Sequence, residues 1–249
     1  MGVELSRVLG VSRSLLIYYG QPWQRRKLQT FYSQFVRPGD LVFDIGAHVG
    51  SRSRTLLSLG ASVVALEPQT DFANVIERTL RHEKLILRRE AVGRAPGSIE
   101  LHISSRHPTV TTTSASWIAS VKDSSGFEQV EWDRTERVVM TTLDLLIEKH
   151  GCPAFCKIDV EGAEADILRG LSHPIRTIAF EYLPAAMTIA REAVGELQRL
   201  GRYRFNRTIG ENHQFLHQDW LTAEALLGEL SRLERSSQSG DIYARLEEL

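Results

Sequence analysis

The chain of 249 residues is long enough for one large α/β domain, and 42% of its residues are hydrophobic, which is sufficient for a sizeable core. Its 30 Lys and Arg residues almost balance its 31 Asp and Glu residues, so net charge gives no reason to expect nucleic acid or an anionic membrane as a partner. The two cysteines, Cys152 and Cys156, cannot make a four-ligand zinc site by themselves, and the apolar run at 15–19 is too short to span a membrane. We therefore expect a cytoplasmic protein without a stable membrane anchor.

Residues 1–38 are predicted to form a helical segment. Apolar and aromatic residues recur at nearly helical spacing from Pro22 to Val36, and a proline costs nothing in the first turn of a helix. Pro38, Gly39 and Asp40 end the segment and lead into the next element. Two interpretations stay open: a helix that closes a ligand cleft, or an ordinary surface helix with an apolar face.

The stretch from Leu41 to Glu67 has the outline of a nucleotide-binding βαβ unit. Two apolar runs, which end in Asp44 and Glu67, enclose a glycine turn and a short amphipathic helix that ends at Gly60. The turn reads Gly46-Ala47-His48-Val49-Gly50. It therefore lacks both the G-x-G-x-x-G of a dinucleotide site and the G-K-[ST] of a P-loop.

These residues favour a ligand with a ribose and a cationic tail but no phosphate. Asp44 would repel a phosphate and suits an amine or a sulfonium, while Glu67 at a strand tip can accept hydrogen bonds from a ribose diol. Glycine lets the backbone approach such a ligand closely. S-adenosylmethionine fits this description, and an ordinary βα turn of an α/β protein is the alternative.

The rest of the chain continues the alternation of strands and helices. The predicted strands lie at 85–89, 98–103, 137–140, 154–158 and 177–180, and the predicted helices at 70–82, 142–150, 164–171, 185–200 and 222–233. Strands at 203–207 and 213–216 are expected to form a closing hairpin, and residues 235–249 a polar, loosely held tail. The pattern predicts one α/β domain at 39–234 with a mainly parallel sheet and one antiparallel strand.

Residues 104–129 break this rhythm. Their Thr-rich part, 109–117, has no helical period and no charges. Because a long loop inside a compact domain is often functional, this segment is either a lid or substrate wall, or else a disordered segment or plain β-insertion.

Acids stand at the carboxyl ends of five predicted strands, where an α/β sheet binds its ligands. They are Asp44, Glu67, Glu90, Asp159 and Glu181. This placement predicts an acidic rim around a cationic or metal-assisted site.

Several blocks of the sequence resemble the FkbM family of S-adenosylmethionine-dependent methyltransferases. They are L-V-F-D-I-G-A-H-V-G (41–50), A-L-E-P (65–68), T-T-L-D-L-L (141–146), K-I-D-V-E-G-A-E (157–164) and A-F-E-Y (179–182). The first block is shared by many methyltransferases, whereas the block at 157–164 is specific to this family. The resemblance implies a Rossmann-like class I methyltransferase fold: a seven-stranded, mostly parallel sheet with an antiparallel C-terminal hairpin strand and helices on both faces. It also implies methyl transfer, usually to a hydroxyl oxygen of a sugar, polyketide or other secondary metabolite.

On this basis the glycine turn and the strand ends are expected to hold S-adenosylmethionine. The cofactor-binding candidates are Asp44, Gly46, Ala47, His48, Gly50, Glu67, Pro68, Glu90, Ala91 and Asp159, and the catalytic candidates are Asp159, Glu161 and Glu181. Asp159 and Glu161 are expected either to act as a base or to bind a divalent cation such as Mg²⁺, which would lower the pKa of the substrate hydroxyl. His48 and His213 are alternative bases.

Other functions stay open at this point. The alternatives are an N- or carboxyl-methyltransferase, a non-catalytic cofactor-binding partner subunit and, more weakly, a Rossmann dehydrogenase. The expected partner is a small-molecule acceptor, not nucleic acid. The sequence identifies neither the acceptor nor the oligomeric state, with a homo-oligomer among the possibilities.

Overall fold

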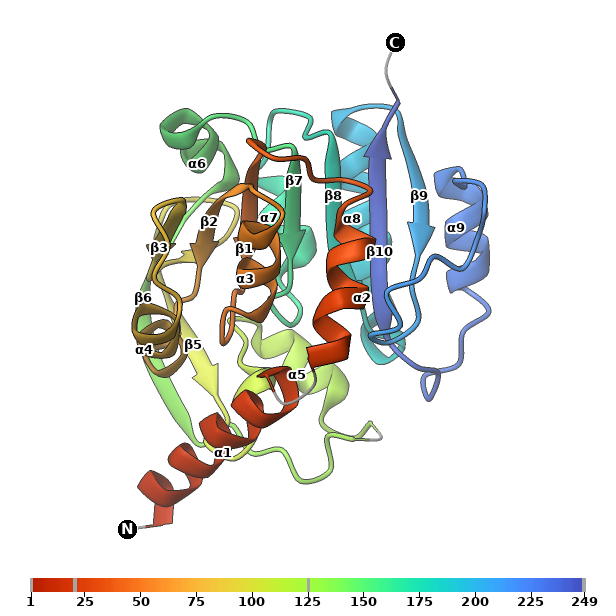
Figure 1. The fold of residues 1–249 in the computed structure, drawn as a ribbon. Helices are drawn as coiled ribbons and strands as arrows, with labels where there is room; N and C mark the ends of the chain where they lie inside the picture. Colours follow the sequence, from red (N-terminus) through yellow and green to blue (C-terminus); the bar gives the residue numbers. More distant parts are fainter. Residues whose placement is uncertain (1, 20–21, 125, 248–249) are drawn as a thin grey trace.

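The fold is built around one large β-sheet, whose strands lie side by side from β3 to β9 in Figure 1. The computed structural model describes residues 2–19, 22–124 and 126–247. In this part of the chain the sheet has seven strands, in the order β3 (Leu85–Arg88), β2 (Ser62–Leu66), β1 (Leu41–Ile45), β7 (Phe155–Ile158), β8 (Thr177–Tyr182), β10 (Gly240–Leu246) and β9 (Tyr203–Arg207). The strands from β3 to β8 run parallel, and β10 runs antiparallel to both β8 and β9. This confirms the predicted fold class.

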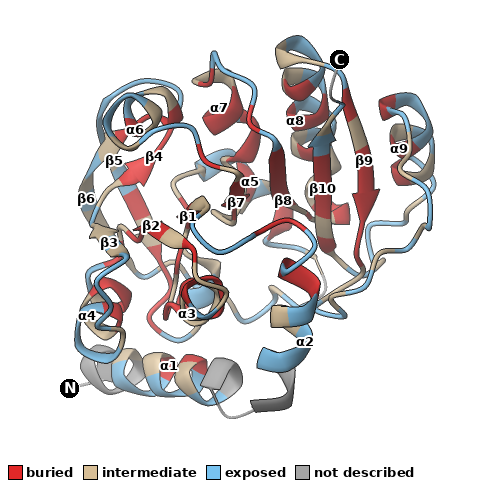
Figure 2. Cartoon of the chain, turned by 45° about the horizontal axis from the view of Figure 1, so that its top comes forward, coloured by how far each residue is buried: buried red, intermediate tan, exposed pale blue. Residues whose placement is uncertain are grey.

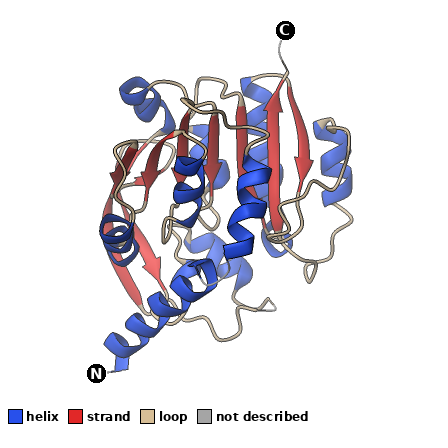
Figure 3. Cartoon of the chain, in the orientation of Figure 1, coloured by secondary structure: helices blue, strands red, loops and turns tan. Residues whose placement is uncertain are grey.

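Helices cover both faces of the sheet, as Figure 3 shows. In β1, Val42 packs into the core on one face and Phe43 into the core on the other, because successive side chains of a strand alternate. The first face carries α2 (Pro22–Tyr32), α3 (Ser51–Ser58) and α4 (Thr70–Thr79); the second carries α6 (Leu143–His150), α7 (Glu164–Arg169), α8 (Met187–Leu200) and α9 (Ala223–Leu230). The central strands are consequently buried, as their red colour in Figure 2 indicates.

Local signals in the sequence determine where several helices begin and end. The side chains of Thr142 and Thr222 accept a hydrogen bond from the backbone N–H three residues further on, so each threonine caps the helix that follows. Gly60 has φ +87° just beyond α3, the left-handed conformation that ends a helix readily. The predicted helix boundaries at Thr142 and Gly60 are thereby confirmed.

A second, smaller sheet adjoins the large one. Its strands are β4 (Ala91–Val92), β6 (Arg134–Thr141) and β5 (Gly97–Ile103), in that order. The chain between β5 and β6 contains the short 3-10 helix η1 (Pro108–Val110) and helix α5 (Ala115–Val121). The Thr-rich segment is therefore an ordered part of this insertion, and the alternative of a disordered segment is wrong.

Helix α1 (Gly2–Tyr19) lies against this insertion. The two come close together at Gly10, where a Cβ would stand 2.6 Å from the backbone oxygen of Ser105 and 2.9 Å from Pro108. Only a glycine permits this approach, so α1 supports the insertion from outside. Helices α1 and α2 occupy the segment predicted to be helical; residues 1, 20 and 21 of that segment lie outside the described residues.

The C-terminal part of the chain differs from the prediction. Residues 213–216 form a loop, and the antiparallel partner of β9 is β10, within the segment predicted to be a loose tail. In that loop Phe215 is held by aromatic packing on Phe31 and Tyr243, with ring centroids 5.0 and 5.3 Å apart, instead of by strand pairing. The apolar residues of β10 at 242–244 are fully enclosed between β8 and β9. Residues 248–249 of the predicted tail lie outside the described residues.

None of the helices in the described ranges is long and apolar enough to cross a membrane.

Candidate functional site

A cavity of about 520 Å³ opens beyond the carboxyl ends of the parallel strands. It is the place where ligands bind in α/β sheets. Most residues that the sequence nominated line it: Gly46, Ala47, His48, Glu67, Pro68, Glu90, Ala91, Asp159, Glu161 and Glu181. Asp44 and Gly50 do not.

Asp44 lies behind the cavity wall. It is fully buried at the end of β1, where Ser53 Oγ donates a hydrogen bond to its Oδ2 at 2.5 Å. Its Oδ1 is 3.7 Å from Nη1 of Arg52, which does line the cavity. Burial raises the pKa of Asp44, and the Arg52 guanidinium opposes this effect. Asp44 therefore acts on the site through Arg52.

Gly50 also faces away from the cavity. A Cβ there would stand 3.1 Å from Ile76 of α4, and its φ of +78° forms the entry into α3. The missing side chain lets the turn pass close to α4.

The turn between β1 and α3 forms one wall of the cavity. Gly46 has φ +79°, and a Cβ at this position would overlap the backbone oxygen of Asp159. The N–H groups of Gly46 and Ala47 donate to Leu66 O at 2.9 and 3.0 Å. His48 follows with φ +53°, and burial lowers its pKa to about 3. Its ring is therefore neutral near pH 7 and a weak base.

Glu67 presents a buried carboxyl group to the cavity at the tip of β2. Its Oε1 accepts a hydrogen bond from Gln69 N at 2.8 Å, and its Oε2 accepts one from His48 N at 2.7 Å. Burial raises the pKa of Glu67 to about 8, although these two hydrogen bonds act in the opposite direction. Glu90 also lines the cavity, but its carboxylate forms an ion pair with Arg88 at 2.5 Å.

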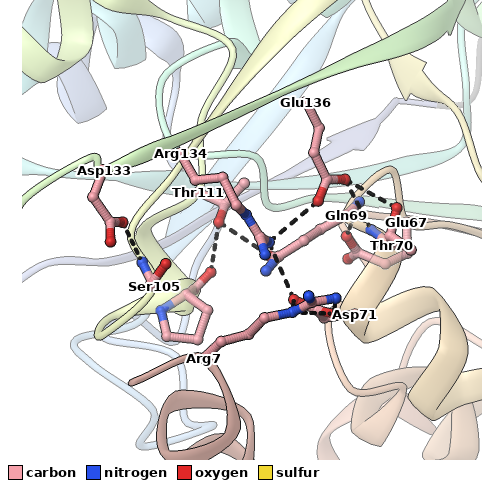
Figure 4. Close-up of polar contacts among 11 residues, drawn as sticks. Arg7, Glu67, Gln69, Thr70, Asp71, Ser105, Thr111, Asp133, Arg134 and Glu136 are labelled. Atoms are coloured by element: carbon pink, nitrogen blue, oxygen red, sulfur yellow. Dashed lines mark hydrogen bonds and ion pairs between the residues drawn. The ribbon is translucent and has the colours of Figure 1, made fainter. Parts of the chain in front are cut away.

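The turn that follows Glu67 is held from three sides, as Figure 4 shows. The contacts are Thr111 with Gln69, Thr70 with Glu136, and Arg7 and Arg134 with Asp71. They come from the Thr-rich insertion, from β6 and from α1. The position of Glu67 is thus fixed by elements that are distant in the sequence.

A row of alternating charges connects α3, β7 and β10. Arg52 Nη2 donates to Asp159 Oδ2 at 2.8 Å, and the fully buried Lys157 Nζ lies 3.7 Å from Asp159 Oδ1 and 2.6 Å from Asp241 Oδ1. Burial alone would raise the pKa of Asp159, but Lys157 and Arg52 lower it to about 2. Asp159 is therefore ionised near pH 7 and holds little affinity for a proton.

Glu161 and Glu181 are carboxyl groups of a different kind. Both line the cavity, and no residue in the described ranges donates a hydrogen bond to either carboxyl group. Burial raises the pKa of Glu161, and the negative charge of Glu181 raises it further; burial and the charge of Asp159 raise the pKa of Glu181. These two groups hold a proton at pH values where Asp159 does not.

The predicted binding of a divalent cation by Asp159 and Glu161 does not fit these surroundings. The Asp159 carboxylate is already neutralised by Arg52 and Lys157, which would repel a metal ion. Among the described residues, no three His, Cys, Asp or Glu side chains gather in a way that could hold one.

The opposite wall of the cavity comes from segments that the sequence left open or placed wrongly. Thr109, Thr111 and Thr113 of the insertion line it, which supports the interpretation of this segment as a wall. Tyr32 of α2 and His213 of the loop after β9 line it as well. Burial and Arg52 lower the pKa of His213 to about 4, so this alternative base is also weak near pH 7.

The sequence analysis missed Arg52, Lys157 and Asp241. Lys157 carried a usable signal, because a lysine inside an apolar strand is rarely buried without a partner. Arg52 lies in the run Ser51-Arg52-Ser53-Arg54, which reads as an ordinary polar helix start. Asp241 stood in the supposed tail.

The model of the methyltransferase FkbM domain matches residues 44–230. Comparison with curated proteins gives no match.

Similar solved structures include three methyltransferases. One is precorrin-6y C5,15-methyltransferase from Geobacter metallireducens GS-15, at 12% identity over 90% of this chain and 87% of that chain, with a TM-score of 0.47. The O-methyltransferase from Bacillus cereus in complex with SAH is 13% identical over 96% and 90%, with a TM-score of 0.48. Magnesium protoporphyrin IX methyltransferase from Synechocystis PCC 6803 with bound SAM is 13% identical over 95% and 84%, with a TM-score of 0.47. Similarity this low carries no argument about the reaction.

Proposed function

The chain belongs to the FkbM methyltransferase family, and we propose that it transfers a methyl group from S-adenosylmethionine to a hydroxyl oxygen of a sugar, polyketide or other secondary metabolite. The donor supplies an electrophilic methyl group on its sulfonium. The chain itself must hold the donor, align the hydroxyl with that methyl group and accept the hydroxyl proton. Alignment of two reactants can contribute about 7–11 kcal/mol.

The half of the cavity beside β1 and β2 fits the donor. The turn at Gly46 lines this half, and the missing side chain lets the turn lie directly against the backbone of Asp159. Glu67 is a buried carboxyl group at the cavity surface, suited to accept hydrogen bonds from a ribose diol. A cavity of about 520 Å³ is within the usual range for a small-molecule site.

The pair Glu161 and Glu181 carries the proposal of a hydroxyl acceptor. Burial and neighbouring negative charges raise the pKa of both carboxyl groups, and a carboxylate with a raised pKa is a stronger base toward the proton of a hydroxyl group. A carboxylate acceptor would be repelled by this pair, and an amine attacks through a lone pair without needing a base at that moment. Two partly buried acids that form no ion pair with any described residue are costly to the fold, and a non-catalytic cofactor-binding subunit has no reason to retain them.

Replacement of the pair tests this function. We expect Glu161→Gln and Glu181→Gln each to lower turnover by about 10²–10⁴-fold, the usual contribution of a general base, while S-adenosylhomocysteine affinity changes less than about twofold. Turnover is measured as S-adenosylhomocysteine release with a panel of neutral glycosides and polyketide lactones. Glu77→Gln, on the exposed face of α4, is the matched control and should behave as wild type.

Two outcomes would contradict the proposal in different ways. If both variants retain full turnover, the base lies elsewhere. If the wild-type protein does not bind S-adenosylhomocysteine, the donor itself is wrong.

A further inference from the structure

Arg52 has an unusual position for a residue in the first turn of a helix. It lines the cavity beside the turn from Gly46 to Gly50, and its side chain is 21% exposed. It stands between two acids: Asp159, which also lines the cavity, and Asp44, which is buried behind it. Because Asp44 remains beside it, the Arg52 guanidinium keeps a negative neighbour even when the Asp159 carboxylate binds a ligand instead.

Most of the hydrogen-bonding capacity of Arg52 is unused. Within the described ranges only Asp159 accepts a hydrogen bond from it, at 2.8 Å, and the 3.7 Å contact with Asp44 is too long to be one. A guanidinium carries several N–H donors in a planar fork that matches a carboxylate. Arg54 also lines the cavity, but its Nη2 donates to Thr79 O at 3.0 Å.

We propose that Arg52 binds the α-carboxylate of the methionine tail of the methyl donor, while Asp159 beside it binds the α-ammonium group. The inference rests on the proposed function and names a binding residue for it. The methionine tail carries its ammonium group and its carboxylate on the same carbon atom. Arg52 and Asp159 present the two complementary charges side by side. Asp159 N donates to Ile45 O at 2.9 Å, so this pair stands directly beside the turn at Gly46.

The alternative role of Arg52 is purely structural, as a counter-ion for Asp44 and Asp159. In that case the affinity of the protein would not depend on whether a ligand has a carboxylate. The two roles therefore differ in ligand selectivity, which can be measured without any catalytic assay.

The first test uses the wild-type protein and three ligands in titration calorimetry. S-adenosylhomocysteine has the whole tail, 5′-(3-aminopropylthio)adenosine lacks only the carboxylate, and 5′-methylthioadenosine lacks both charged groups. We expect removal of the carboxylate to weaken binding about 10- to 100-fold, as for loss of a hydrogen bond to a charged group. Equal affinity for the first two ligands would overturn the proposal.

The second test removes the guanidinium. Arg52→Gln should weaken S-adenosylhomocysteine binding by the same factor and leave the affinities of the other two ligands within about twofold, so that the carboxylate no longer contributes. Arg54→Gln is the matched control and should keep the wild-type difference between ligands. Selectivity that survives Arg52→Gln, or disappears in Arg54→Gln instead, would also overturn the proposal.

Two further comparisons keep the test decisive. If Arg52→Gln does not fold, Arg52→Lys takes its place. Because an ammonium group lacks the planar fork, this variant should bind S-adenosylhomocysteine at least about threefold more weakly and 5′-methylthioadenosine as tightly as the wild type. Equal weakening of both ligands would contradict the inference. A wild-type protein that binds none of the three ligands would show that the proposed function fails, which is a separate outcome.

Discussion

At the scale of single residues, backbone strain marks the cavity. Among the residues that the structure describes, three that are not glycine have a left-handed backbone: His48, Glu161 and His213, with φ of 53°, 56° and 49°. All three line the cavity. This conformation costs about 1 kcal/mol or more for each residue and persists where the side-chain position matters. The sequence revealed the turn at Gly46 because glycine signals such a conformation, whereas a histidine or glutamate does not.

The raised pKa of Glu67 predicts that donor affinity depends on pH. Ribose hydroxyls donate to the ionised Glu67 carboxylate, so the donor binds the deprotonated form. Below the Glu67 pKa of about 8 the carboxyl group must first release its proton, which weakens binding. We expect S-adenosylhomocysteine affinity to rise about fivefold between pH 7 and pH 8. Calorimetry in buffers of different ionisation enthalpy should show proton release on binding.

Glu67→Gln provides the control for this effect. It should bind more weakly and show no rise between pH 7 and pH 8, because a glutamine does not titrate there. A wild-type affinity that is flat over this range would show that Glu67 does not hold the ribose.

At the scale of elements, the sequence predicted what depends on local pattern and missed what depends on distant pairing. The alternation of strands and helices, and caps such as Thr142, are local signals, and the structure confirms them. The pairing of β5 with β6 and the insertion of β10 between β8 and β9 join segments far apart in the chain. In β10 the apolar run is only three residues long and follows polar residues, so nothing local distinguished it from a tail.

The position of β10 predicts that a small substitution in it is costly. Ile242→Ala removes a fully buried side chain from the core and should lower the free energy of unfolding by about 2–5 kcal/mol. Urea unfolding followed by circular dichroism measures this change. Glu247→Ala, which removes the exposed ion pair with Arg204, should cost no more than about 1 kcal/mol. Equal and small losses in both variants would mean that this segment is not part of the core.

At the scale of the whole molecule, the sheet divides the proposed reaction between two sides. The ends of β1, β2 and β7 present the glycine turn, Glu67 and Asp159 to the proposed donor, while β8 and β10 present Glu181 and Asp241 on the other side. The cavity lies where the chain order of the strands changes, between β1 and β7, as ligand sites in open α/β sheets do. The acids at the strand ends could be predicted because they follow apolar runs; their charge partners could not, because Arg52 and Asp241 come from other parts of the fold.

A ligand at this boundary should stabilise the entire fold. S-adenosylhomocysteine at 100 times its Kd is expected to add about 2.7 kcal/mol to the free energy of unfolding, which corresponds to roughly 5–10 °C in Tm for a domain of this size. Differential scanning calorimetry measures the shift. 5′-Methylthioadenosine at the same concentration, which lacks both charged groups of the tail, is the control and should give a much smaller shift.

The place of β10 also determines the order in which the protein is assembled during synthesis. The ribosome releases β1, β2, β3, β7, β8 and β9 before β10, so the large sheet cannot close until residues 240–246 have emerged. Until then β8 and β9 each have an unpaired edge, and unpaired strand edges are sites where chains can pair wrongly and aggregate. Lys157 likewise gains its closest carboxylate only when Asp241 arrives with β10. The acceptor side of the cavity is thus completed last, by a stretch of chain that resembles a dispensable tail.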